Sequence, residues 1–125
     1  VPYTEVSKHL ADASVGIVPY EESAGTHCAF VAKLVEYVAS GLPAVCTPIK
    51  SIQSYFKDDP MVKFSMFDGN DFGAKILAVI DESPKIWQLA AAKSAARVQA
   101  ELDWQPLCRK AIDFTEKVLV KKKSA

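Results

Sequence analysis

The sequence predicts an α/β fold in which helices flank a small parallel sheet. Three short runs rich in apolar residues, at 15–18, 44–47 and 62–67, predict strands, and the first lacks alternation, as in a strand covered on both faces. Longer segments with apolar residues at helical spacing separate these runs. Strands that alternate with helices pair in parallel through right-handed crossovers, so the order β-α-β-α-β-α indicates a parallel sheet.

The first half of the chain contains two predicted helices, one strand and one loop. Residues 3–13 follow a proline and carry apolar side chains on one face, which predicts a helix. The strand at 15–18 ends at a Pro-Tyr pair, and the Ser-, Gly- and Thr-containing stretch 21–28 predicts a loop. The clearest helix covers 29–40, because its apolar residues recur at four-residue spacing and Gly41 supplies a left-handed stop.

The second half continues the alternation. The run 44–47 stands between two prolines and predicts a buried strand, followed by a short helix over 51–56 and the strand at 62–67. Asp71 is predicted to cap the next helix. Ser83 and Pro84 open an alanine-rich helix that reaches Leu102, and a last helix follows the break at residues 104–106.

The predicted architecture is a partial Rossmann-like parallel sheet with flanking helices. Only three strands are visible, whereas a doubly wound sheet has about five or six. The first helix also has no strand before it. We therefore expect a truncated domain over 1–120, corresponding to the later part of such a sheet, and a basic tail over 121–125.

Length, charge and cysteine content exclude several classes of function. The chain has 125 residues, which suits one domain. Fifteen Lys and Arg balance fifteen Asp and Glu, so nucleic acid is not an expected partner. The three cysteines are far apart and form no C-x-x-C pair, which argues against disulfides or a zinc site and predicts no metal. With no signal peptide or apolar run of about 18 residues, the expected location is the cytoplasm.

The most informative region for chemistry is the start of the helix predicted at 29–40. Ligands of open parallel sheets bind beyond the carboxyl ends of the strands. Unpaired N–H groups of Phe30, Val31 and Ala32 would favour a phosphate there. Lys33 offers an ammonium to phosphate oxygens, and Glu36, about 9 Å along the axis from Phe30, offers a carboxylate to sugar hydroxyls. The alternative is a surface Lys33–Glu36 ion pair without a ligand.

Three stretches carry a resemblance to a known family. Residues 31–47 (VAKLVEYVASGLPAVCT) resemble the donor-binding signature of GT-B glycosyltransferases, and residues 11–20 (ADASVGIVPY) resemble the preceding segment of their C-terminal lobe. Asp103-Trp104 before a terminal helix looks like the usual ending of that lobe. The resemblance implies that the chain is the nucleotide-sugar-binding lobe of a glycosyltransferase. Such a lobe is inactive without an N-terminal lobe, which supplies the acceptor site. The resemblance identifies no catalytic residue in this chain.

Within this family, two branches are similar to the chain. In the family 4-like branch, Glu36 matches the glutamate that holds the ribose, while Cys28 replaces a second glutamate and Val31 replaces a glycine. The bacterial GumK-type glucuronosyltransferases match better. By that resemblance Tyr20 lies beside the base, Lys33 neutralises the UDP diphosphate and Glu36 holds the ribose. The donor implied is a UDP-sugar, with no further cofactor, used on a saccharide or lipid-linked acceptor in polysaccharide biosynthesis.

The sequence is compatible with more than one function and with more than one role for several polar residues. A non-catalytic Rossmann-like interaction module without bound nucleotide is the alternative function. His27 is either an exposed loop histidine or a hydrogen-bond donor to phosphate. Glu21-Glu22 either belongs to a solvated loop, binds a metal or repels a second phosphate. Lys121–Lys123 forms either a solvated tail or a peripheral contact with the inner face of an anionic membrane.

Overall fold

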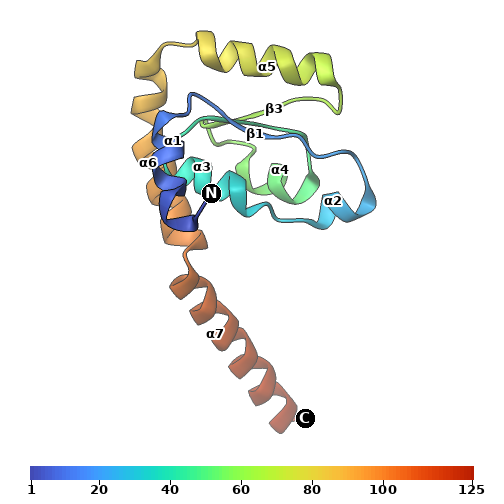
Figure 1. Cartoon of the computed structure of the whole chain (residues 1–125). Helices are drawn as coiled ribbons and strands as arrows, with labels where there is room; N and C mark the ends of the chain where they lie inside the picture. Colours follow the sequence, from blue (N-terminus) through green and yellow to red (C-terminus); the bar gives the residue numbers. More distant parts are fainter.

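The computed structural model describes residues 1–125 and contains a mixed α/β body with a long terminal helix (Figure 1). The elements in chain order are η1 (Tyr3–Glu5), α1 (Val6–Asp12), β1 (Gly16–Val18), α2 (Ala24–Cys28), α3 (Ala32–Ala39), β2 (Ala44–Cys46), α4 (Lys50–Phe56), β3 (Val62–Phe64), α5 (Gly69–Asp81), α6 (Pro84–Leu102) and α7 (Trp104–Lys123). The predicted alternation of three strands with helices is confirmed, and α2 is a helix that the sequence did not predict.

The three strands form one open parallel sheet in the order β1-β2-β3. Gly16 of β1 pairs with Ala44 of β2, which in turn pairs with Val62 of β3. Each connection passes through helix, so all three carboxyl ends meet at one edge. The sheet agrees with a partial Rossmann-like arrangement.

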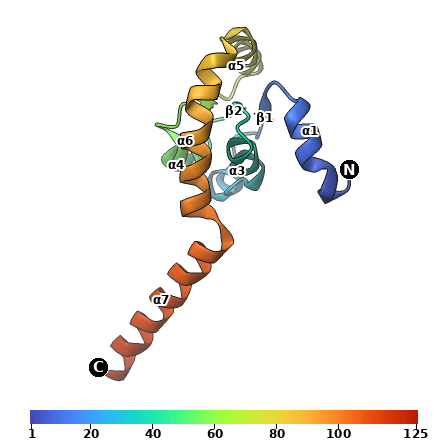
Figure 2. The ribbon, with the colours of Figure 1, turned by 90° about the vertical axis from the view of Figure 1, so that its left-hand side faces the viewer.

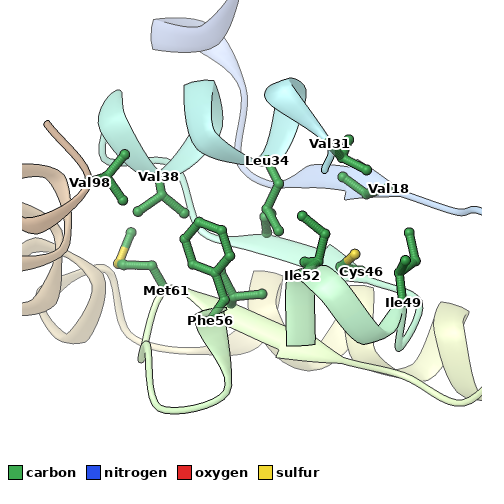
Figure 3. Packing of buried hydrophobic residues seen from close by; sticks show 12 residues of the cluster. Val18, Val31, Leu34, Val38, Cys46, Ile49, Ile52, Phe56, Met61 and Val98 are labelled. Atoms are coloured by element: carbon green, nitrogen blue, oxygen red, sulfur yellow. The ribbon is translucent and has the colours of Figure 1, made fainter. Parts of the chain in front are cut away.

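Helices cover the two faces of the sheet unequally. In Figure 1, α3 and α4 lie on one side of the sheet and α5 lies on the other, while α6 passes along the body and packs on α3. The core fills the space between the sheet and α3, α4 and α6. Figure 3 shows its side chains converging there, including Leu34, Phe56, Met61 and Val98.

The strands differ in how they are covered, which corrects one prediction. β2 is buried along its whole length, as an apolar run between two prolines suggested. β1 is covered on one face only, because Val18 points into the core whereas Ile17 is 47% exposed. Helix α5 contacts β2, in the middle of the sheet, and β1 forms an open edge. The prediction that β1 is covered on both faces is therefore wrong.

Several predicted boundaries also move. The helix expected over 3–13 divides into η1 and α1, and the expected loop at 21–28 contains α2. Ser23 caps the N-terminus of α2, since its hydroxyl accepts from the Thr26 N–H while the Thr26 hydroxyl accepts from the Ser23 N–H. The cap of α5 is Asp68 rather than Asp71.

The chain enters α3 later than predicted and leaves it as predicted. Its first helical residue is Ala32, not Ala29. Gly41 adopts the left-handed conformation with φ 75°, which lets the chain turn from α3 into β2. The expected basic tail is partly helical, because Lys121–Lys123 form the last turn of α7.

A polar cluster fastens α6 to the loop before β3. The Asp59 carboxylate, whose side chain is 1% exposed, accepts from Arg97 at 2.8 Å, from the Ser94 hydroxyl at 2.8 Å and from the Met61 N–H at 3.0 Å. The Arg97 guanidinium also stacks 4.5 Å from the ring centre of Tyr55. The buried Asp59 carboxylate thus accepts from three donors, two on α6 and one in the loop before β3.

Candidate functional site

A cavity of about 400 Å³ lies at the carboxyl edge of the sheet. Its lining comes from the chain that follows each strand: Pro19, Tyr20, Glu21 and Glu22 after β1, Thr47 after β2, and Phe67, Asp68, Gly69 and Phe72 after β3 and into α5. We call it the carboxyl-edge cavity. Its position is the one at which open parallel sheets bind ligands.

Thr47 joins the ends of β1 and β2 beside this cavity. Its hydroxyl oxygen accepts a hydrogen bond from the Tyr20 N–H at 3.1 Å and donates to the Val18 carbonyl at 3.4 Å. The Thr47 N–H donates to the same carbonyl at 3.1 Å. Thr47 therefore holds the backbone of Tyr20 in place while leaving its phenol ring partly exposed.

His27 connects three segments around the same edge. Its Nδ1 accepts from the Lys50 N–H at 3.3 Å, Nε2 lies 3.5 Å from Glu22, and its ring meets Phe67 edge-on at 5.8 Å. Because Nδ1 accepts, the ring proton of the neutral form is on Nε2, facing Glu22. With a side chain only 16% exposed, His27 is placed to position Glu22 rather than to meet a phosphate in solvent.

The cavity contains aromatic rings and carboxylates but no cation. Tyr20, Phe67 and Phe72 supply ring surfaces, whereas Glu21, Glu22 and Asp68 supply acceptors. The Asp68 carboxylate already accepts a hydrogen bond from the Asp71 N–H at the start of α5. Such a lining suits a flat, hydroxyl-bearing ligand, because rings stack on rings and carboxylates accept from hydroxyls.

The first turn of α3 is different from the predicted phosphate site. Phe30 and Val31 precede the helix, so their N–H groups are not part of its first turn. Val31 is buried in the core, and Phe30 meets Tyr55 edge-on at 6.0 Å. The Leu34 N–H already donates to the Val31 carbonyl at 3.2 Å, so the N–H groups without such a partner at the start of α3 are those of Ala32 and Lys33.

Lys33 and Glu36 do not neutralise each other. Neither side chain forms an ion pair in the structure, so the alternative of a simple surface pair is not what is seen. Because α3 begins at Ala32, Glu36 lies only about 6 Å along the axis from the first helical residue, at about 1.5 Å per residue.

Glu36 lines a second cavity, of about 470 Å³, between α1 and α3. Its other walls come from η1 and α1, including Tyr3, Ser7 and Leu10, and from the end of α3. We call it the α1–α3 cavity. The structure thus places Tyr20 and Glu36 in separate cavities, and Lys33 is exposed on the helix that carries Glu36.

Five lining residues of the carboxyl-edge cavity were not predicted from the sequence: Thr47, Phe67, Asp68, Gly69 and Phe72. A signal for two of them was present, since Thr47 ends the second apolar run and Asp68 begins a turn after the third. Both positions follow strands of a parallel sheet, so both belong to its carboxyl edge.

Metal-ligating side chains are not grouped in the structure, and one of the three thiols is buried. No three His, Cys, Asp or Glu side chains are grouped so that they could hold a metal ion. Cys28 is exposed, whereas Cys46 is buried in β2, and burial raises the pKa of the Cys46 thiol from 9.0 to about 12. Cys46 is therefore a neutral packing residue rather than a nucleophile.

We expect a Cys28→Ser, Cys108→Ser variant to leave Cys46 unreactive toward a thiol reagent at pH 8 until denaturant is added. The raised pKa also predicts a pH effect. The contribution of Cys46 to the free energy of unfolding is complete below about pH 9 and is lost as the pH rises toward 12, because only the unfolded chain releases the proton there. Rapid labelling of the native double variant would contradict the assignment.

No protein-family model, curated protein or solved structure matches the chain. The glycosyltransferase resemblance therefore stays a prediction. None of the helices is both long enough and apolar enough to cross a bilayer.

Proposed function

We propose that the chain is the nucleotide-sugar-binding part of a GT-B glycosyltransferase, with a UDP-sugar as donor. The observation that carries the proposal is the carboxyl-edge cavity, because it lies where parallel sheets bind ligands and has Tyr20 in its wall. The free side chains of Lys33 and Glu36 on α3 support it further, since neither has an ion-pair partner.

In this proposal the base lies against Tyr20 in the carboxyl-edge cavity, the diphosphate meets the Lys33 ammonium, and Glu36 accepts from the ribose hydroxyls. A donor that reaches all three must extend over the exposed first turn of α3, since Tyr20 and Glu36 line different cavities. Lys33 matters for the reaction as well as for binding. Glycosyl transfer expels UDP, and a fixed cation stabilises the charge that develops on this leaving group.

The rest of the enzyme would be a second lobe of the same protein. In the proposal that lobe brings the saccharide or lipid-linked acceptor and the catalytic groups, so this chain alone binds donor without transferring the sugar. The proposed place of the reaction is the cytoplasmic side of a membrane. Sugar transfer from a UDP-sugar by the purified chain alone would contradict this division of roles.

The test is calorimetric titration of the chain with UDP and with GDP. We expect UDP to bind, and Lys33→Ala to weaken binding about tenfold to a hundredfold because a charged hydrogen bond is lost. Tyr20→Ala should weaken UDP binding by a comparable factor, because the base loses its stacking partner. Glu36→Ala should weaken UDP binding because the ribose hydroxyls lose their acceptor. Lys93→Ala, an exposed lysine change on α6, is the control and should have no effect.

The pattern of losses decides between the alternatives. A loss with Tyr20→Ala alone would confine the nucleotide to the carboxyl-edge cavity and contradict the roles of Lys33 and Glu36. Tighter binding of GDP would contradict the UDP assignment. A folded chain that binds neither nucleotide would contradict the proposal and favour the interaction module.

A further inference from the structure

Helix α7 presents a broad apolar face that the rest of the chain does not cover. Figures 1 and 2 show α7 extending away from the body beyond the end of α6, and none of its residues is buried. At about 1.5 Å per residue its 20 residues span about 30 Å. A free helix of this length needs a surface against which its apolar side chains are removed from water.

Eight apolar side chains of α7 gather on one half of the helix. At about 100° per residue, these eight fall within an arc of about 160°, whereas Val120 lies outside it. We call this arc the apolar face of α7; its members are Trp104, Leu107, Cys108, Ala111, Ile112, Phe114, Val118 and Leu119. The arc is much wider than the two positions in seven that a paired helix buries.

The remaining surface of α7 is strongly basic. The helix contains six Lys and Arg against two Asp and Glu. Lys110, Lys117 and Lys121 follow one margin of the apolar face, and Lys122 continues the face itself into the last turn. A lysine in the seam between two packed helices is costly, whereas at a lipid surface its stem lies along apolar groups and its ammonium reaches the headgroups.

We propose that α7 lies on an anionic membrane surface, with its apolar face at the boundary of the acyl chains and its lysines among the headgroups. Half-apolar width, aromatic anchors in Trp104 and Phe114, and a cationic flank are together the features of an interfacial helix. The net positive charge of α7 selects anionic lipid. This inference uses no residue of the proposed donor site and does not depend on it.

The test is co-sedimentation of the whole chain with vesicles of phosphatidylcholine alone and with about one-third phosphatidylserine. We expect binding to the anionic vesicles at least tenfold tighter than to the neutral ones. Raising the salt from about 0.1 M to 1 M should weaken it, because the screening length falls from about 10 Å to 3 Å. Replacing Lys121, Lys122 and Lys123 by glutamate should reduce binding to anionic vesicles at least tenfold.

Two matched substitutions separate the apolar face from charge alone. Phe114→Asp and Val120→Asp each place one carboxylate in α7, at residues 70% and 66% exposed, but Val120 lies opposite the apolar face. We expect Phe114→Asp to weaken vesicle binding at least tenfold more than Val120→Asp. Neither residue contributes to the core, so circular dichroism should show the same folded body in both.

Four results would overturn the proposal. They are absence of binding to anionic vesicles, equal binding to both vesicle types, equal effects of the two aspartates, and a dimer in sedimentation that Phe114→Asp dissociates while vesicle binding is absent. The last result would assign the apolar face to a second copy of the chain.

Discussion

Replacing Arg97 with methionine is expected to lower the free energy of unfolding by about 3 kcal/mol, because Asp59 then stays buried without its cation. The Asp59 side chain is 1% exposed, and the Arg97 guanidinium lies 2.8 Å from it. The two neutral donors that remain, Ser94 and the Met61 N–H, do not balance the charge. The loss lies at the lower end for a buried pair, since Arg97 is itself 33% exposed. Urea denaturation measures it.

Two further variants show whether the unpaired charge is the cause. Arg109→Met makes the same change on exposed α7 and should alter stability by less than about 0.5 kcal/mol. Adding Asp59→Asn to Arg97→Met removes the buried charge, so the double variant should be more stable than Arg97→Met alone. If Arg97→Met lowers the free energy of unfolding no more than Arg109→Met does, the cluster around Asp59 does not hold α6 to the body.

The parts of the fold that follow from local pattern were predictable. Short apolar runs between helices indicate parallel strands whatever their surroundings, and Gly41 indicates the end of α3 because the turn needs a positive φ. The exposure of Ile17 was not predictable. It depends on where α5 packs, and an apolar run alone does not tell which face of a strand receives a helix.

The candidate site was predictable in position but not in composition. Tyr20 lies at the carboxyl edge because it follows β1, which sequence order dictates. The separation of Tyr20 from Glu36 could not be predicted from the sequence, because it comes from the cavity that α1 and α3 line together and from a helix start at Ala32. The pairing of Asp59 with Arg97 could not be predicted either, since Arg97 is distant in sequence and lies on α6.

Gly16→Ala is expected to lower the free energy of unfolding by about 1–3 kcal/mol through overpacking. A Cβ atom at Gly16 would lie 2.3 Å from Cδ2 and 2.6 Å from Cγ of the Tyr37 ring, so the ring or α3 must move away from β1. Thermal or urea denaturation measures the loss. Gly73→Ala is the matched control, because its Cβ meets nothing within 4 Å and alanine favours the helix by up to about 1 kcal/mol.

The contact with Tyr37 also connects stability with the proposed site. Tyr37 is on α3 beside Glu36, and Gly16 begins the strand that leads to Tyr20. In a Tyr37→Ala background the ring is absent, so Gly16→Ala should cost little, and the difference between the two backgrounds measures the coupling. An equal cost in both backgrounds would exclude the ring as the cause. Because α3 carries Lys33 and Glu36, displacement of α3 from β1 should weaken UDP binding in Gly16→Ala but not in Gly73→Ala.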